Sequence, residues 1–128
     1  MIDHTGVSVS DFQKSRRFYA QALAPLGYAP LMELSAAQTG GRDVAGFGVA
    51  PKPDFWVSSG AANVPPMHVA FRAASRAQVD AFHKAAIAAG GRDNGAPGLR
   101  PHYHADYYGA FVLDPDGHNI EAVCHRPE

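Results

Sequence analysis

The chain has 128 residues, of which 46% are hydrophobic and 18% charged, and its formal charge is −1, from 11 basic against 12 acidic residues. A chain of this length is expected to form one domain, residues 1–128, because two independent units of half the size would each bury too little apolar surface. No basic run is present that would bind phosphate backbones or anionic lipid, so neither nucleic acid nor a membrane is an expected partner.

The sequence repeats at an offset of 64 residues. At this offset the identical pairs are His4 and His68, Phe18 and Phe82, Ala22 and Ala86, Ala24 and Ala88, Gly27 and Gly91, Phe47 and Phe111, and Pro51 and Pro115. The predicted elements also follow the same order in both halves. We therefore expect two related modules, about 1–60 and 67–128, joined by a linker over residues 60–66.

The first module is predicted to open with a strand that begins at His4. Its alternation directs Thr5, Val7 and Val9 to one face and His4 to the other. A helix follows, capped by Ser10 or Asp11 and stopped by the Pro-Leu-Gly segment at 25–27. Three strands are expected next, near 28–34, 43–49 and 54–58.

The second module repeats this order. A strand from His68 is followed by a helix that Ser75 caps and the glycines at 90–91 end. Strands are predicted near 92–94, 107–113 and 118–124, with a loop over 95–106 and a tight Asp-Pro-Asp-Gly turn at 114–117. Each half is thus βαβββ, and the fold class is α+β. One helix covers one face of each sheet, so the other face lines a cavity or meets a partner.

His4 and His68 lie on the face that the helices leave free. Glu121 interrupts an apolar last strand and, by parity, lies on the same face. A buried carboxylate is costly unless it is paired or bound to metal. Two imidazoles and one carboxylate are a typical ligand set for Fe(II), Mn, Co, Ni or Zn. The alternative is two hydrogen-bonded histidines in polar crevices and an exposed glutamate on an edge strand.

Further candidates surround this set. Pairing through the turn at 114–117 predicts Tyr108 opposite Val123, on the face of Glu121, where its phenol could act as a general acid or orient a substrate. Arg72 could bind a carboxylate or phosphate, or form a structural ion pair. His102 and His104 lie in the loop near the cavity mouth and are candidates for substrate binding and proton transfer. Trp56 is expected either in the core, which is favoured, or as an aromatic wall, and Phe55 and Val57 are candidates for substrate contact.

Three segments resemble the vicinal oxygen chelate superfamily, which includes glyoxalase I, extradiol dioxygenases and bleomycin-binding proteins. They are His4 to Tyr19, His68-Val-Ala-Phe, and Phe111 to Glu121 with its Asp-Pro-Asp-Gly-His turn. The resemblance implies two βαβββ modules in a cup-shaped curved sheet, with helices outside and a divalent metal held by His4, His68 and Glu121. It also implies an enzyme that chelates vicinal oxygens of a small organic substrate, of lyase or isomerase type. The alternatives are a ring-cleaving dioxygenase and a non-catalytic protein that binds a bleomycin-like antibiotic.

One departure argues against ordinary glyoxalase I activity. That enzyme has a fourth ligand, a glutamate in the first module, and the offset of 64 puts the position at Val57. We also expect a homodimer, because each four-stranded sheet keeps edges that need cover. The lone Cys124 and the absence of a signal segment predict a reducing, cytoplasmic location.

Overall fold

Each half of the chain forms a four-stranded sheet with one long helix, in a computed structural model that describes residues 1–128. The first module contains β1 (Thr5–Val9), α1 (Phe12–Ala22), η1 (Ala24–Leu26), β2 (Ala29–Leu34), α2 (Ala36–Thr39), β3 (Val44–Gly48) and β4 (Phe55–Ser59). The second contains β5 (His68–Arg72), α3 (Arg76–Ala88), β6 (Arg92–Leu99), β7 (Tyr108–Leu113) and β8 (Asn119–Cys124). The predicted α+β fold of two βαβββ modules is confirmed.

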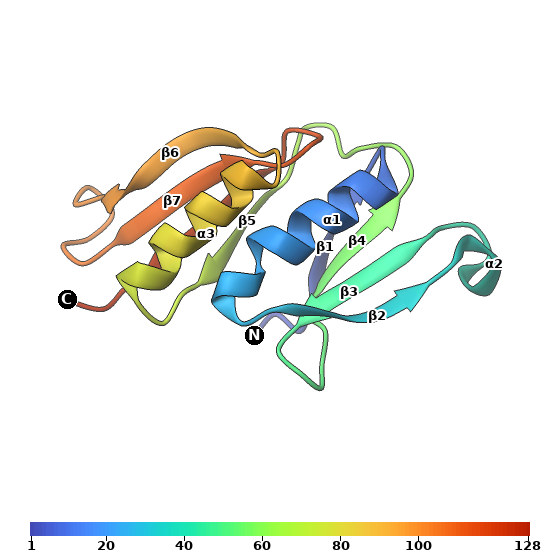
Figure 1. Ribbon diagram of the computed structural model, residues 1–128, viewed down its shortest axis with the longest axis horizontal. Helices are drawn as coiled ribbons and strands as arrows, with labels where there is room; N and C mark the ends of the chain where they lie inside the picture. Colours follow the sequence, from blue (N-terminus) through green and yellow to red (C-terminus); the bar gives the residue numbers. More distant parts are fainter.

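The two sheets have the same topology. Their strand orders are β1-β4-β3-β2 and β5-β8-β7-β6, with the first strand of each module parallel to the last and all other pairs antiparallel. Helices α1 and α3 lie side by side in front of the sheets, with β2 and β6 at opposite outer edges (Figure 1). The sheets are not hydrogen-bonded to each other, so no closed barrel forms. We call the face of each sheet that α1 or α3 covers its helix face and the other its open face.

Matching caps begin the two long helices. The Asp11 carboxylate accepts a hydrogen bond from the backbone N–H of Lys14, and the Ser75 hydroxyl accepts one from that of Gln78. Each cap satisfies one of the N–H groups that the first helical turn leaves without a partner. No α-helix of the chain combines the length and apolarity that crossing a bilayer requires.

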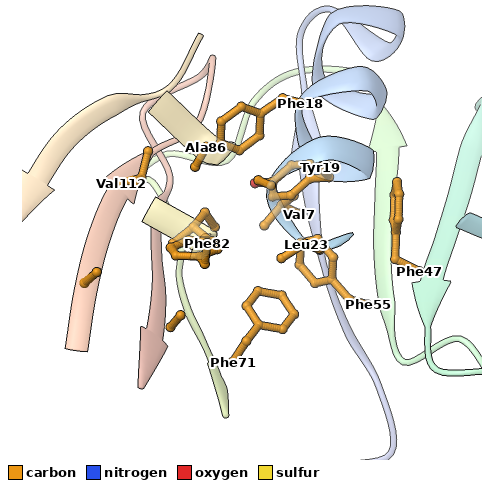
Figure 2. Packing of buried hydrophobic residues seen from close by; sticks show 14 of the residues in the cluster. Val7, Phe18, Tyr19, Leu23, Phe47, Phe55, Phe71, Phe82, Ala86 and Val112 are labelled. Carbon is orange, nitrogen blue, oxygen red and sulfur yellow. The ribbon is translucent and has the colours of Figure 1, made fainter. Parts of the chain in front are cut away.

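A single apolar core joins the two helix faces. Phe18 of α1 and Phe82 of α3, equivalent in the repeat, are both buried in it. The labelled side chains of both modules point into the space between the helices and the sheets (Figure 2). Phe55 of the first sheet meets Phe71 of the second edge to face, with ring centroids 5.1 Å apart. The two halves therefore stabilise each other through shared burial.

Polar contacts from the turn after β7 also join the modules. His118 is fully buried, with Nε2 3.0 Å from the carbonyl oxygen of Ser8, and its Nδ1 accepts from the backbone N–H of Met67 at 2.9 Å. The buried Asp114 carboxylate accepts a hydrogen bond from the Tyr19 hydroxyl at 2.5 Å. His118 thus connects β1 with the segment before β5. These contacts are with distant segments and could not be predicted from the sequence of the turn.

One predicted boundary is wrong. The expected strand at 92–94 is β6, which continues to Leu99, so residues 95–99 of the predicted loop over 95–106 are strand. Its pairing with β7 shifts register twice, around Asp93 to Gly95 and again before Gly98. These irregularities remove the two-residue periodicity by which a strand is recognised.

Candidate functional site

The open face of the second module carries the predicted functional groups of β5 and β8. Along β5, Phe71 is buried toward the helix side, whereas His68 and Arg72 are exposed. Along β8, Ile120 belongs to the core, while Glu121 reaches His68 on the open face. The faces predicted for these strands are correct.

His68, Glu121 and Tyr107 form a connected polar group. The Nε2 atom of His68 lies 3.1 Å from Oε1 of Glu121, and the Tyr107 hydroxyl donates a hydrogen bond to Oε2 of the same carboxylate. Glu121 is only 3% exposed. Burial and the hydrogen bond to Glu121 raise the pKa of Tyr107 above its ordinary value, so its phenol is protonated at neutral pH and serves as a donor.

A chain of amides orients the His68 ring. The side-chain nitrogen of Asn94 donates to Oδ1 of Asn119 at 3.2 Å, and Nδ2 of Asn119 lies 3.0 Å from Nδ1 of His68. An amide nitrogen can only donate, so in this arrangement Nδ1 of His68 accepts and Nε2 carries the proton that faces Glu121. The ring is therefore held with Nε2 toward the carboxylate.

Once Nε2 of His68 releases its proton, the His68 and Glu121 pair fits two neighbouring positions around one divalent ion. Ligand atoms about 2.1 Å from a common metal lie about 3 Å apart when they occupy adjacent positions, and Nε2 to Oε1 is 3.1 Å. Asn119 and Tyr107 contact the other atoms of the imidazole and the carboxylate, as supporting groups do in metal centres. Nitrogen and carboxylate donors suit Fe(II), Mn, Co, Ni and Zn.

His4 lies apart from this pair. It precedes β1, and its Nδ1 is 2.7 Å from Oδ2 of Asp3, with 60% of its side chain exposed. His4, His68 and Arg72 all line one open pocket of about 370 Å³ along the edge of β5. No three His, Cys, Asp or Glu side chains of the chain are arranged to hold a metal ion. One chain therefore brings His68 and Glu121 together but does not add His4 to them.

The predicted position of Tyr108 is wrong. In the β7–β8 hairpin, Tyr108 pairs with Cys124 rather than with Val123, and its hydroxyl donates to Oδ1 of Asp80 on α3 at 2.6 Å. The strands first pair at Leu113 and Asn119, so the connection takes residues 114–118 and includes the buried His118. One additional turn residue moves every side chain of β7 to the opposite face.

Tyr107 was missed in the sequence for the same reason. It lies just before β7, at the first residue of the predicted strand over 107–113, and reaches Glu121 where Tyr108 was expected. If the connection had been predicted to include His118 and so to have five residues, Tyr107 rather than Tyr108 would have been expected on the face of Glu121.

Of the two predicted cavity positions on β4, that of Val57 is wrong, because Val57 has no exposed surface and belongs to the core. Phe55 also belongs to the core and is 1% exposed, but it lines the pocket that contains His4, His68 and Arg72. Trp56 instead lies on the open face, where a Cβ added to Gly46 would come within 2.8 Å of its indole ring. Glycine on β3 therefore leaves room for the indole on this face.

Trp56 is the structural counterpart of Glu121. Gly6 of β1 pairs with Trp56, and Ala70 of β5, the residue 64 positions later, pairs with Glu121. Trp56 and Glu121 are 65 positions apart, so the second module has one extra residue before this point. The position equivalent to Glu121 in the first module therefore holds an indole instead of Val57 and offers no metal ligand.

The remaining candidates lie at one end of the second sheet. His104 Nε2 is 2.8 Å from Nδ1 of His125, and the His102 ring packs 4.2 Å from that of Tyr103. Arg72 is exposed and takes part in none of the ion pairs of the chain, so its alternative role in a structural ion pair is not observed.

Comparison with known proteins gives one family. The family model described as Glyoxalase/Bleomycin resistance protein/Dioxygenase superfamily matches residues 1–122. No curated protein matches the chain.

Solved structures with the same fold cover nearly the whole chain. A glyoxalase/bleomycin resistance protein from Albidiferax ferrireducens is 30% identical, with a TM-score of 0.74 and 98% of both chains covered. A glyoxylase/bleomycin resistance protein/dioxygenase domain from Frankia sp. is 16% identical, with a TM-score of 0.73 and the same coverage. Glyoxalase I from Zea mays is 20% identical, with a TM-score of 0.69, and the match covers 99% of this chain but 45% of the maize chain.

Proposed function

The chain belongs to the glyoxalase/bleomycin resistance protein/dioxygenase superfamily, and from this membership we propose that it is a divalent-metal-dependent enzyme acting on a small organic substrate with vicinal oxygens. A lyase or isomerase reaction is favoured. The observation that carries the proposal is the pair of donor atoms on His68 and Glu121, 3.1 Å apart on an open face.

His68 and Glu121, completed by His4, would hold the ion. When bound, a divalent metal chelates and polarises neighbouring substrate oxygens as a Lewis acid. Tyr107 is a positioning residue, because its hydroxyl holds one carboxylate oxygen and leaves the other directed at His68. His104, in contact with His125, is the proposed proton-transfer group, and His102 and Arg72 are the proposed substrate contacts.

We propose that the complete site forms in a homodimer. His4 is not grouped with His68 and Glu121 within one chain. Strands β1 and β5 are both sheet edges without a hydrogen-bonded neighbour on one side, so two copies can meet along them. In such a dimer, His4 of one copy completes the ligand pair of the other.

Metal analysis tests the ligand set. The protein, purified without chelator, is expected to hold stoichiometric divalent metal, and His4→Ala and Glu121→Ala are expected to lose it while keeping the thermal unfolding midpoint within a few degrees. Trp56→Phe, at the counterpart position of the first module, is the matched control and keeps its metal. Absence of metal from the unmodified protein, or its retention in Glu121→Ala, contradicts the proposal.

A mixing experiment tests the dimer. Neither variant binds metal alone, but hybrids of His4→Ala with Glu121→Ala contain one intact site of two. A fully exchanged mixture should then recover about a quarter of the metal of the unmodified protein, since about half of its dimers are hybrids. No recovery after verified subunit exchange, or metal binding by a monomer, contradicts the shared site.

Two other activities have specific support. The loop histidines His102 and His104 favour a ring-cleaving dioxygenase, which needs a proton carrier beside the metal. The half-buried indole of Trp56 on the open face favours a non-catalytic protein that binds a flat, bleomycin-like antibiotic. Catechol turnover by iron-loaded protein identifies the first, and antibiotic binding that Glu121→Ala leaves unchanged identifies the second.

A further inference from the structure

A second hollow, of about 500 Å³, opens at the C-terminal end of β5. Its walls are Arg72, Ala73, Ala74, His125 and Arg126. Two arginines, one histidine and two alanines thus line it, and no acidic residue does. The chain as a whole is nearly neutral, so this concentration of basic groups is local.

The two arginines of the hollow have no acidic partner. Among the lysines and arginines of the chain, Arg16 pairs with Glu33 and Lys52 with Asp3. Neither Arg72 nor Arg126 takes part in any ion pair of the chain. The acid closest to Arg126 in sequence, Glu128, accepts hydrogen bonds from the backbone N–H of Arg76, at 2.8 Å, and from the Cys124 thiol. The guanidinium charges of the hollow are therefore not neutralised by an ion pair within the chain.

His125, which also lines the hollow, has a defined tautomer with a free ring N–H. The backbone N–H of Asp106 donates to Nδ1 of His104 at 3.1 Å, so the proton of a neutral His104 ring is on Nε2. That Nε2 donates to Nδ1 of His125 at 2.8 Å. His125 in turn carries its own proton on Nε2, and a backbone amide outside the hollow fixes this tautomer.

We propose that this hollow binds the anionic group, carboxylate or phosphate, of a small organic molecule. Guanidinium groups match the planar, two-oxygen geometry of these anions, and the imidazole N–H adds a further hydrogen bond. The alanine side chains leave room for the anion. With no acceptor side chain present, the hollow is unsuited to a cation.

The hollow also indicates the chemical class of the substrate, an inference that rests on the proposed function. Arg72 and His68 lie on the same face of β5, four residues and so about 13 Å apart along the strand. Arg72 lines both the hollow and the pocket that contains His68. One molecule can therefore reach both sites, which makes the substrate an organic acid or phosphate ester whose charged group is well separated from its vicinal oxygens.

Titration with inorganic phosphate and with acetate, at constant ionic strength, tests the anion site. We expect saturable shifts of the Arg72 and Arg126 Nε–H and His125 ring signals in nuclear magnetic resonance spectra of the full chain. Arg72→Gln and Arg126→Gln should each weaken binding of the preferred anion at least tenfold. Arg17→Gln, which removes an exposed arginine of α1, is the matched control and should leave binding unchanged. The stronger of the two titrations identifies the anion as phosphate or carboxylate.

Shifts that never saturate, or equal weakening in Arg17→Gln, would overturn the anion site. Metal content separates this result from the proposed function, because Arg72→Gln keeps His68 and Glu121 intact. If Arg72→Gln loses anion binding but retains its metal, the result supports an anion site separate from the metal site. Saturable anion binding by a protein that holds no metal overturns the proposed function but not the anion site.

Discussion

The first and second modules place the same kinds of side chain on their helix faces and different kinds on their open faces. Phe18 and Phe82 occupy equivalent core positions, whereas Trp56 and Glu121 occupy equivalent open-face positions. The shared core requires both helix faces to stay apolar, so the repeat persists there. The open faces carry no such constraint, and a polar network has formed on one of them only.

The largest expected effect lies in the core that both modules share. Phe18→Ala and Phe82→Ala should each lower the free energy of unfolding by about 3–5 kcal/mol, because each leaves a cavity among buried neighbours. Urea denaturation measures both. A pair of separate transitions, or a loss below about 1 kcal/mol for either variant, would break the equivalence of the modules.

The next largest effect is expected at Tyr19 and His83, the residues that follow Phe18 and Phe82 and are equivalent in the repeat. Tyr19→Phe removes the hydroxyl that donates to the buried Asp114, and should destabilise the fold by about 1.5–3 kcal/mol. Its counterpart in the repeat is His83, which pairs with the exposed Asp93 at 3.0 Å. His83→Ala should cost less than about 1 kcal/mol, as surface pairs do. Equal losses in the two variants would contradict this difference.

The stability that Tyr19 contributes should also depend on pH in the alkaline range. Burial and the Asp114 carboxylate raise the pKa of Tyr19 well above its usual value, so the folded chain keeps this phenol neutral where the unfolded chain ionises it. Its contribution is complete below the unfolded pKa of about 10 and is lost as the pH rises above that value, by about 1.4 kcal/mol per pH unit. Denaturation curves up to a pH of about 11 should decline less steeply for Tyr19→Phe than for the unmodified chain. Parallel declines would show that Tyr19 ionises freely in the fold.

A smaller effect tests the support of the proposed metal site. Asn119→Ala removes the amide that orients His68 and should weaken metal binding by about 10–100-fold. Trp56→Phe, on the open face of the other module, should leave metal affinity unchanged. Competition with a chromogenic chelator measures both affinities. Unchanged affinity in Asn119→Ala would show that the orientation of His68 does not depend on this amide.

The smallest effect compares the two helix caps. Asp11→Ala and Ser75→Ala each remove one hydrogen bond to the first helical turn and should each cost about 1 kcal/mol. Because the caps hold equivalent positions, thermal unfolding should report similar losses. A loss confined to one variant would show that the other helix depends on packing alone.

Local pattern was enough to predict the repeat, the helix caps and the faces of β1, β5 and β8. Alternation along a strand and apolar spacing along a helix reflect which side chains are buried, and neither depends on distant neighbours. His68 and Glu121 were identified in this way, because both stand out on faces that could be assigned from their own segments.

Features that depend on strand register and on contacts between the modules could not be predicted from local pattern. Whether Tyr107 or Tyr108 reaches Glu121 rests on one residue of the hairpin connection, since a shift of one residue exchanges the two faces of a strand. Trp56 lies on the open face because Gly46 of a neighbouring strand leaves space for its indole. Patterns within one segment thus identify the residues that this segment buries, whereas the packing of distant segments determines which polar groups meet.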